Sequence, residues 1–409
     1  PGQWYLHTFA SQQPDLRCDH PEVLAHFNDM FRFWFDRGVD GFRVDAIIVM
    51  GKEQGLPNAT PVPAGVLPED AWQFNRHTIN HPSLFPIVAE WRKTFDDYQR
   101  EHSRVLVSVS EAYTPRTPQN LLRYIGDGRF HQSFTFDLLL EPWNARAMEQ
   151  AIRTNYETLK AAGASYTWTL NNHDSHRIVT RYGRVDADEF YSGNNLMNSS
   201  GAIDIALGTL RARAALLMML ALPGSAYLYM GEELGLPEVL DLPNERREDP
   251  IFHRSHGAQI GRDGCRIPMP WTNDAATGFG FTTTNIDPWL PPPADWDTYS
   301  VQTQNDDPES MLNLYRAALQ LRPLFMSAED HLEVSTQGHL LVLQRGHVLV
   351  LVNFGMQPIG LSHDFVPANM GLGKHTAVLT SSAGALSTAG QLSGNSCAWL
   401  VRERAQPLA

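Results

Sequence analysis

Basic residues are scarce in this chain of 409 residues, where 32 lysines and arginines stand against 45 aspartates and glutamates, for a formal net charge of −13. An acidic protein of this kind repels phosphate backbones and anionic lipid headgroups. The composition therefore predicts no nucleic-acid partner and no membrane partner. Neutral or cationic ligands suit it better.

Cysteines and long apolar runs are also scarce. Cys18, Cys265 and Cys397 are far apart and in no metal-ligand spacing, which predicts no metal site and a reducing, cytoplasmic compartment. The longest apolar run, residues 214–222, is too short to span a bilayer and predicts a buried helix. No secretory peptide is visible, but the chain opens with Pro1 rather than Met, which leaves open whether this is its natural start.

Segments with strand character alternate with amphipathic helical patterns up to about residue 230. The predicted strands cover residues 39–44, 105–109, 134–139, 166–170 and 226–230. This alternation predicts an α/β fold with a parallel sheet. Five strands could form an open doubly wound sheet, although the glycine-rich loop of many such folds is missing. The alternative is a (β/α)8 TIM barrel to which this chain contributes about five strand-helix units.

The pattern changes twice after that point. Residues 234–307 are rich in Pro, Gly, Asp and Trp and form a segment too long for an ordinary connection, which is typical of a functional loop. A helix predicted over 311–321 is followed by short alternating runs that indicate a C-terminal antiparallel β-sandwich. We therefore expect one domain over residues 1–326 and an all-β domain over 327–409.

Three acidic residues lie at the C-terminal tips of predicted strands: Asp45, Glu111 and Asp174. Because parallel strands end on the same face of a sheet, the three carboxyl groups are expected to project together. Glycoside hydrolysis needs two carboxyl groups across a small gap, one to protonate the leaving oxygen and one to attack the sugar or activate water. The spacing does not say which acid has which role, and three unrelated turn caps would give the same pattern.

Other chemistries find less support. His173 beside Asp174 could contribute to a metal site, but no second histidine is placed with it. The chain has no nucleophile elbow for a catalytic serine and no cysteine near a histidine that would activate its thiol.

Five short strings carry a specific resemblance. Residues 41–46 (GFRVDA), 110–112 (SEA) and 172–174 (NHD) resemble three signature regions of the α-amylase family of glycoside hydrolases. Residues 13–16 (QPDL) and 261–271 (GRDGCRIPMPW) are similar to the α-glucosidase and oligo-1,6-glucosidase branch of that family. The resemblance extends over essentially the whole chain.

The resemblance implies a retaining mechanism with Asp45 as nucleophile and Glu111 as general acid and then base. Asp174 would bind hydroxyl groups of the non-reducing-end glucose, and Arg43 would keep Asp45 ionised. The further residues for which it implies substrate binding or pocket shaping are His173, Arg177 and Arg262. No cofactor is implied in this chain.

The activity implied is that of an exo-acting α-glucosidase that removes terminal α-linked glucose from short oligosaccharides or α-glucosides, with transglucosylation left open. The small residue Ala46 after the nucleophile resembles the α-1,4-acting members. Sucrose isomerases and trehalose synthases share the three acids, although the Arg-Leu-Asp-Arg-Asp signature of sucrose isomerisation is missing. An alternative from another class is a catalytically inactive carbohydrate-binding or transporter-associated relative.

The family's barrel has eight strands, and the five predicted here correspond to the fourth to eighth. The first three strands, most of an inserted domain and a frequent calcium-binding loop find no match. Half a barrel leaves two sheet edges open. We therefore expect an N-terminal complementary segment or chain as a partner, with any calcium in that portion.

Overall fold

A computed structural model describes residues 2–64, 74–114, 116–184, 202–283, 286, 288–326, 331–361 and 375–402. The chain divides into two compact units, the first made of residues 1–136 and 157–167 and the second of residues 137–156 and 168–409. Both the helix α5 (Ala145–Ala161) and the strand β4 (Thr167–Thr169) cross this division.

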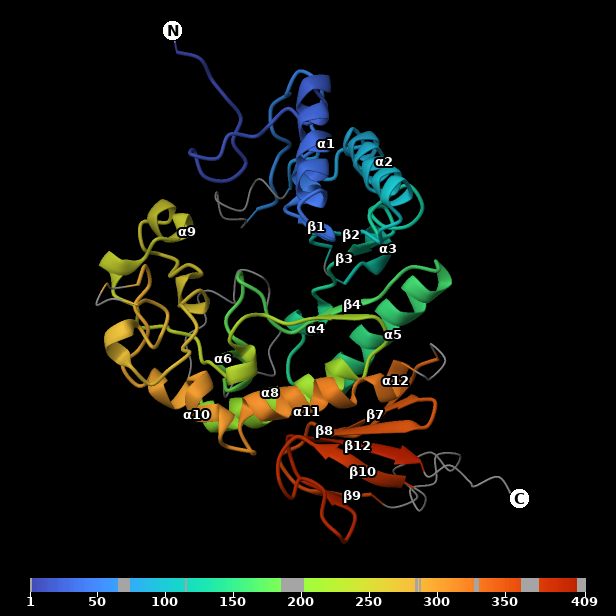
Figure 1. Cartoon of the computed structure of the whole chain (residues 1–409), viewed down its shortest axis with the longest axis vertical. Coiled ribbons are helices and arrows are strands. Elements are labelled where there is room, and N and C mark those ends of the chain that lie inside the picture. The colour runs from blue at the N-terminus through green and yellow to red at the C-terminus, as the bar shows by residue number, and fades with distance from the viewer. Residues whose placement is uncertain are drawn as a thin grey trace. The chain divides into compact units, whose positions relative to one another are not determined.

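The first unit contains a parallel sheet of three strands in the order β1-β2-β3 (Figure 1). The strands are β1 (Gly41–Val44), β2 (Val107–Ser110) and β3 (Gln132–Ser133). Val44 pairs with Ser110, so the first two strands end at the same level. Other elements of this unit are the helices α1 (Pro21–Phe35), α2 (Leu84–His102) and α3 (Pro118–Leu121) and the short 3₁₀ helix η1 (Ile47–Val49).

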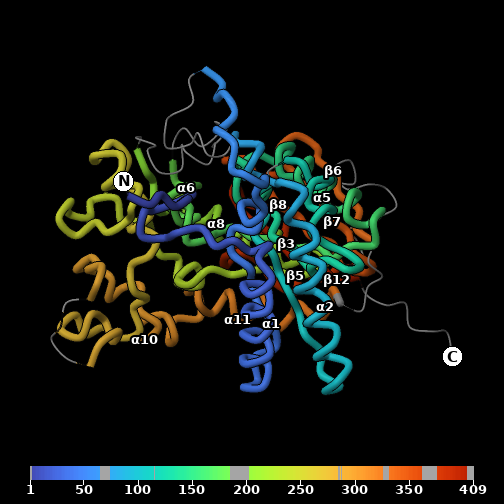
Figure 2. The backbone as a smooth tube through the Cα atoms, turned by 90° about the horizontal axis from the view of Figure 1, so that it is seen from above, coloured from blue at the N-terminus to red at the C-terminus, as the bar shows by residue number. Residues whose placement is uncertain are grey.

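Helix α1 has the start and stop chemistry of a well-defined helix. Pro21 occupies its first turn and the His20 side chain accepts a hydrogen bond from the Glu22 amide, which satisfies one of the free N–H groups there. Its chain reverses after Phe35 through Gly38, whose φ of +95° favours glycine. Helices α1 and α2 lie side by side (Figures 1 and 2).

Aromatic rings fill the space between α1, α2 and β1. The Phe35 ring is fully buried, and its centroid lies 4.9 Å from that of Phe95 and 5.0 Å from that of Tyr98. Phe42 of β1 contacts the same ring at 5.5 Å. This cluster fixes the strand that carries Arg43 against the two helices.

Four of the five predicted strands are present in shorter form, as β1, β2, β4 and β5 (Ser225–Tyr227). The prediction for 134–139 is wrong, because the strand there is only Gln132–Ser133 and residues Asp137–Leu140 form the helix α4. A short buried apolar run has no period that separates strand from helix, and its three consecutive leucines favour a helix.

The second unit holds most of the helices, and β4 pairs with β5 in a two-stranded sheet. Outside the predicted long loop, its described α-helices besides α4 and the first part of α5 are α6 (Ile178–Tyr182), α8 (Ile205–Leu220), α11 (Met311–Leu321) and α12 (Pro323–Met326). Short helices punctuate the predicted long loop: η3 (Glu232–Leu234), η4 (Asn244–Arg246), α9 (Pro250–Arg254), η5 (Asp263–Cys265), η6 (Ala275–Thr277), η7 (Trp296–Tyr299) and α10 (Val301–Asn305). In the described part of the chain, no helix is both long and apolar enough to cross a membrane.

A C-terminal antiparallel sheet of five strands, in the order β10-β12-β8-β7-β6, confirms the antiparallel pattern predicted for the tail (Figure 1). Its strands are β6 (Glu333–Gln337), β7 (Leu340–Arg345), β8 (Val348–Asn353), β10 (His375–Thr380) and β12 (Ser396–Arg402), and a second pair consists of β9 (Ile359–Gly360) and β11 (Gln391–Leu392). One face packs on that pair through Leu351 and Leu392. The predicted boundary at 326/327 adjoins residues 327–330, which lie outside the described residues.

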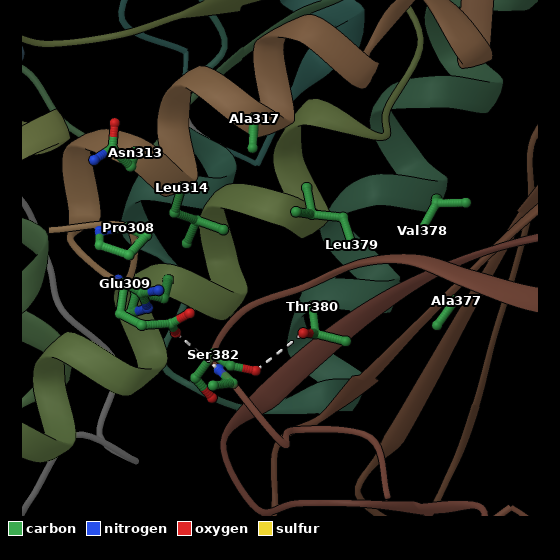
Figure 3. A pocket seen from close by; sticks show the side chains of 12 residues that line it. Pro308, Glu309, Asn313, Leu314, Ala317, Ala377, Val378, Leu379, Thr380 and Ser382 are labelled. Atoms are coloured by element: carbon green, nitrogen blue, oxygen red, sulfur yellow. Dashed lines mark hydrogen bonds between the residues drawn. The ribbon is translucent and has the colours of Figure 1, made fainter. Parts of the chain in front are cut away.

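The other face of this sheet packs on helices. The Trp399 indole donates to the Leu217 carbonyl of α8 at 3.0 Å, and its ring meets that of Phe325 of α12 at 4.8 Å. Beside this interface a pocket of about 380 Å³ lies between α11 and β10, with Leu314 and Thr380 among its walls (Figure 3). No predicted site residue lines the pocket.

Replacing Phe35 with alanine should lower the free energy of unfolding by about 3–5 kcal/mol, because a fully buried ring leaves a cavity among its aromatic neighbours. Phe33→Ala is the matched control on the same helix, since its side chain is exposed, and it should cost less than about 1 kcal/mol. Urea unfolding of the two variants measures the difference. Equal losses would contradict a core centred on Phe35.

Candidate active site

The pairing of β1 with β2 positions the first two predicted acids. Asp45 and Glu111 each follow the last residue of their strand, and the paired residues Val44 and Ser110 bring the strand ends level. The ladder continues one step further, since the Glu111 amide donates to the Val44 carbonyl at 2.9 Å. The two carboxyl groups therefore emerge at neighbouring positions on the carboxyl edge of the sheet.

One guanidinium bridges these two carboxylates. Arg43 donates from Nη1 to Asp45 Oδ1 and from Nη2 to Glu111 Oε2, the second at 2.6 Å. Its side chain is only 31% exposed, while that of Asp45 is 73% exposed and that of Glu111 is 19% exposed. A partly buried cation shared by two acids holds both carboxyl groups in a fixed place.

The backbone after Asp45 takes an unusual conformation. Ala46 has φ 41° and ψ 41°, in the left-handed region that a non-glycine residue occupies only at a cost of about 1–2 kcal/mol. In this conformation the Ala46 amide donates to Glu111 Oε2 at 3.1 Å. Strain of this kind persists where surrounding contacts impose it, and such positions cluster at functional sites.

Burial raises the pKa of Glu111, and the nearby Asp45 charge acts in the same direction. The Ala46 amide and Arg43 oppose this effect without cancelling it. A carboxyl group whose pKa is raised stays protonated at higher pH than an ordinary glutamate, which is the property required of a proton donor.

The third predicted acid lies in the second unit, in the loop after β4. Asp174 Oδ1 accepts hydrogen bonds from Arg262 Nη1 at 2.7 Å and from Arg266 Nη2 at 2.9 Å. His173 Nε2 lies 3.5 Å from Asp174 Oδ2. The Asp174 carboxylate is about one-third exposed, so it combines fixed partners with access from solvent.

Arg177 has a different environment from the other predicted binding residues. It is almost fully buried, and its guanidinium donates to the carbonyls of Met230 and Cys265, both at 2.8 Å. Its own amide donates to Glu238 Oε2 at 2.9 Å. These contacts suit the shaping of the loops around Asp174, and a direct contact of Arg177 with substrate stays a prediction.

The structure thus brings Arg43, Asp45 and Glu111 together in the first unit, and His173, Asp174 and Arg262 together in the second. Sequence reasoning missed Arg266, although it lies in the string 261–271 that carries the resemblance. A spacing signal could not single it out, because the contact joins loops 92 positions apart. Within the described residues no group of three or more His, Cys, Asp or Glu side chains could hold a metal ion.

A buried carboxyl group supports the loop that carries Asp174. Glu232 accepts hydrogen bonds from Asn171 Nδ2 at 2.6 Å and from the Tyr315 hydroxyl at 3.2 Å. Asn171 in turn accepts from the Ile178 amide at 2.8 Å, so both ends of the loop are tied down. Burial raises the pKa of Glu232 to about 7.

This raised pKa makes stability depend on pH with a definite sign. The folded protein holds the Glu232 proton up to a pKa of about 7 whereas the ordinary value is 4.5, so its contribution to stability is fully present below 4.5 and is lost as pH rises through 7. The loss is on the order of 3 kcal/mol.

Glu232→Gln removes this titration, so the unfolding free energy of wild type relative to the variant should fall between about pH 4.5 and about pH 7. Urea unfolding at several pH values measures this difference. Glu238, whose pKa burial also raises to about 7, is present in both proteins, so the difference isolates Glu232. Parallel stability curves for the two proteins would contradict a buried titrating group at this position.

Comparisons with known proteins show the family of the chain. The model of the α-amylase catalytic domain matches residues 1–327. Maltase A2 of Drosophila melanogaster is 28% identical over 335 residues, covering 78% of this chain and 51% of the relative. Oligo-1,6-glucosidase of Parageobacillus thermoglucosidasius is 27% identical, covering 78% of this chain and 56% of the relative.

Among solved structures, the α-glucosyl transfer enzyme XgtA superposes with a TM-score of 0.75 at 30% identity, covering 98% of this chain and 70% of that one. Trehalulose synthase MutB, at 22% identity and a TM-score of 0.75, shows the same fold. The chain spans about half the length of the curated relatives it matches. With its predicted family confirmed over most of its length, the chain belongs to the α-amylase family, whose catalytic-domain model matches residues 1–327.

Proposed function

We propose that this chain carries the catalytic carboxyl groups of an exo-acting retaining α-glucosidase. The observation that supports the proposal best is the Arg43 guanidinium, which binds the Asp45 and Glu111 carboxylates at the level ends of two paired strands. The names of the α-glucosidase relatives supply the substrate class. The substrates are then short oligosaccharides or α-glucosides with a terminal, non-reducing α-linked glucose.

In this mechanism Asp45 attacks the anomeric carbon and Glu111 protonates the departing oxygen. Glu111 then removes a proton from water, which releases glucose from Asp45 with retained configuration. The ion pair with Arg43 holds the Asp45 carboxylate in place. Because both acids bind one guanidinium, their separation suits the short spacing of retaining enzymes better than the wider gap of inverting ones.

The proposal assigns sugar binding to the residues for which the family resemblance implies it. Asp174 and His173 hold hydroxyl groups of the terminal glucose, since a charged acceptor and a ring nitrogen together suit a polyhydroxyl ligand. Arg262 orients Asp174 and shares in substrate binding, and Arg177 shapes the surrounding loops.

Transfer of glucose to an acceptor other than water is a further activity of the same site. The support is the relation to a protein described as an α-glucosyl transfer enzyme, at 30% identity. Chemically, transfer needs only an acceptor hydroxyl that competes with water for the glycosyl-enzyme.

A complementary N-terminal segment or chain completes the proposed enzyme. In the described residues β1 stands at the end of its sheet with β2 as its only neighbour. An open parallel edge next to a catalytic strand is a place where a further strand pairs. Calcium, if bound, belongs to that complementary portion.

Asp45→Asn should abolish release of nitrophenol from p-nitrophenyl α-glucoside, because the amide cannot form the glycosyl ester. Asp40→Asn is the matched control: this aspartate lies just before the opposite end of the same strand, pairs with Arg104 at 2.6 Å and is 80% exposed. Proton NMR of wild-type hydrolysis should show α-glucose first. If β-glucose appears first, the retaining mechanism is wrong.

Glu111→Gln should lose about 10²–10⁴-fold in kcat/KM on maltose, since the leaving hydroxyl there needs a proton. The loss should be smaller on p-nitrophenyl α-glucoside, whose leaving group departs without much help. Activity of wild type should fall as pH rises through the raised pKa of Glu111, and this alkaline limb should be missing in the variant. Equal losses on both substrates would argue against Glu111 as the acid.

The wild-type assay also decides between enzyme and binding protein. Intact mass shows whether a second chain is present in the sample. If the folded wild type is inactive on p-nitrophenyl α-glucoside, maltose, isomaltose and sucrose, the enzyme proposal is wrong. A catalytically inactive carbohydrate-binding relative would then replace it.

A further inference from the structure

The predicted long loop contains a buried acid with no role assigned so far. Asp249 caps helix α9, where its Oδ1 accepts from the Ile251 amide at 3.0 Å. Its side chain is completely buried. A surface cap would not need to be buried, because an exposed carboxylate can satisfy the same free amide.

The main partner of Asp249 is Arg262. Arg262 Nε donates to Asp249 Oδ2 at 2.7 Å and Nη2 donates to Oδ1 at 3.0 Å, which is the two-pronged geometry that fixes the plane of a guanidinium. The Arg262 amide also donates to Oδ2 at 2.7 Å. Three of the nitrogen atoms of Arg262 are therefore held by one carboxylate.

The nitrogen that remains points to the proposed substrate-binding acid. Arg262 Nη1 donates to Asp174 Oδ1 at 2.7 Å. Two carboxylates thus share one guanidinium, one of them buried and held by backbone amides and the other about one-third exposed. Asp249 therefore fixes the Arg262 side chain, and Arg262 in turn holds the Asp174 carboxylate.

The local sequence is built for this contact. Gly261 has φ +74°, and a Cβ there would lie 2.8 Å from the Asp249 Cβ, so only glycine allows the two segments to approach. Asp263 adds a second contact between the same two segments, since its Oδ2 accepts hydrogen bonds from the amides of Glu248 and Asp249 at 2.8 and 3.0 Å.

The charge balance agrees with a fixed ion pair. Burial alone would raise the pKa of Asp249, but hydrogen bonds from Arg262 lower it overall. Loss of this carboxylate leaves a partly buried guanidinium whose remaining charged partner among the described residues is Asp174.

We propose that Asp249 is the positioning residue of the sugar-binding site: through Arg262 it fixes the Asp174 carboxylate that binds the terminal glucose. The inference rests on the proposed function and adds to it a residue that touches no substrate. It also assigns a role to residues 248–263 of the long loop, which hold the substrate-binding Asp174 in position.

Asp249→Asn tests the proposal, because asparagine keeps the cap oxygen and the volume but removes the charge and one acceptor. The expected result is a loss of about a hundredfold in kcat/KM on p-nitrophenyl α-glucoside, the size of effect that a small misplacement of a binding group produces. Asp274→Asn is the matched control, since Asp274 caps η6 in the same way, through the Ala276 amide at 3.0 Å, but is exposed and pairs with no arginine in the described part of the chain. It should leave activity unchanged.

A double-mutant cycle separates positioning from a general loss of structure. If Asp249 acts through Arg262, the double variant Asp249→Asn/Arg262→Met should be no less active than Arg262→Met alone. Additive losses, or unchanged activity in Asp249→Asn, overturn the inference and leave the proposed function standing.

A wild type without activity would overturn the proposed function instead. Calorimetric titration with glucose then tests the inference by itself. Weaker binding by Asp249→Asn than by Asp274→Asn supports it, and equal binding, including no binding by either, overturns it.

Discussion

Parallel pairing between β1 and β2 is the constraint on which the proposed chemistry depends. The register Val44 to Ser110 sets both strands to end at one level, and the next residue of each is an acid. Two carboxylates so close would repel each other, and the bridging Arg43 removes much of that repulsion. A slip of one residue would turn one of the acids to the other face of the sheet, so strand register and chemistry are specified together.

In the second unit, too, one guanidinium pairs with two carboxylates, here from residues farther apart in the sequence. Asp249, Arg262 and Asp174 form an alternating row in which a single guanidinium satisfies two acids. Buried ion pairs contribute little net stability compared with apolar packing, but removing one partner costs several kcal/mol. Such a row is therefore better explained by the geometry that it maintains than by the stability that it adds.

The sequence predicted the elements whose side chains follow a clear period and missed those that depend on contacts. Helix α11 was predicted because its apolar positions recur along one face. Asp45, Glu111 and Asp174 were found because each follows a strand. The region 134–139 was predicted as a strand and contains α4, since three consecutive leucines carry no period. Arg266 and Asp249 act through loops distant in sequence, and no local pattern marks such contacts.

Burying Glu232 to support the loop that carries Asp174 costs free energy. Its carboxyl group lies buried without a cationic partner among the described residues, and burial raises its pKa to about 7, which reflects this destabilisation. Asn171 and Tyr315 nevertheless fix it through hydrogen bonds, and Asn171 passes the constraint to the loop before Asp174. A leucine there would pack without a charge to desolvate but would leave the Asn171 amide unpaired in the interior, at a cost of about 1–3 kcal/mol.

The left-handed Ala46 beside Asp45 is a second such case, since strain there allows the amide contact with Glu111. In both units, then, local instability lies next to a proposed functional acid and is held in place by the packing around it.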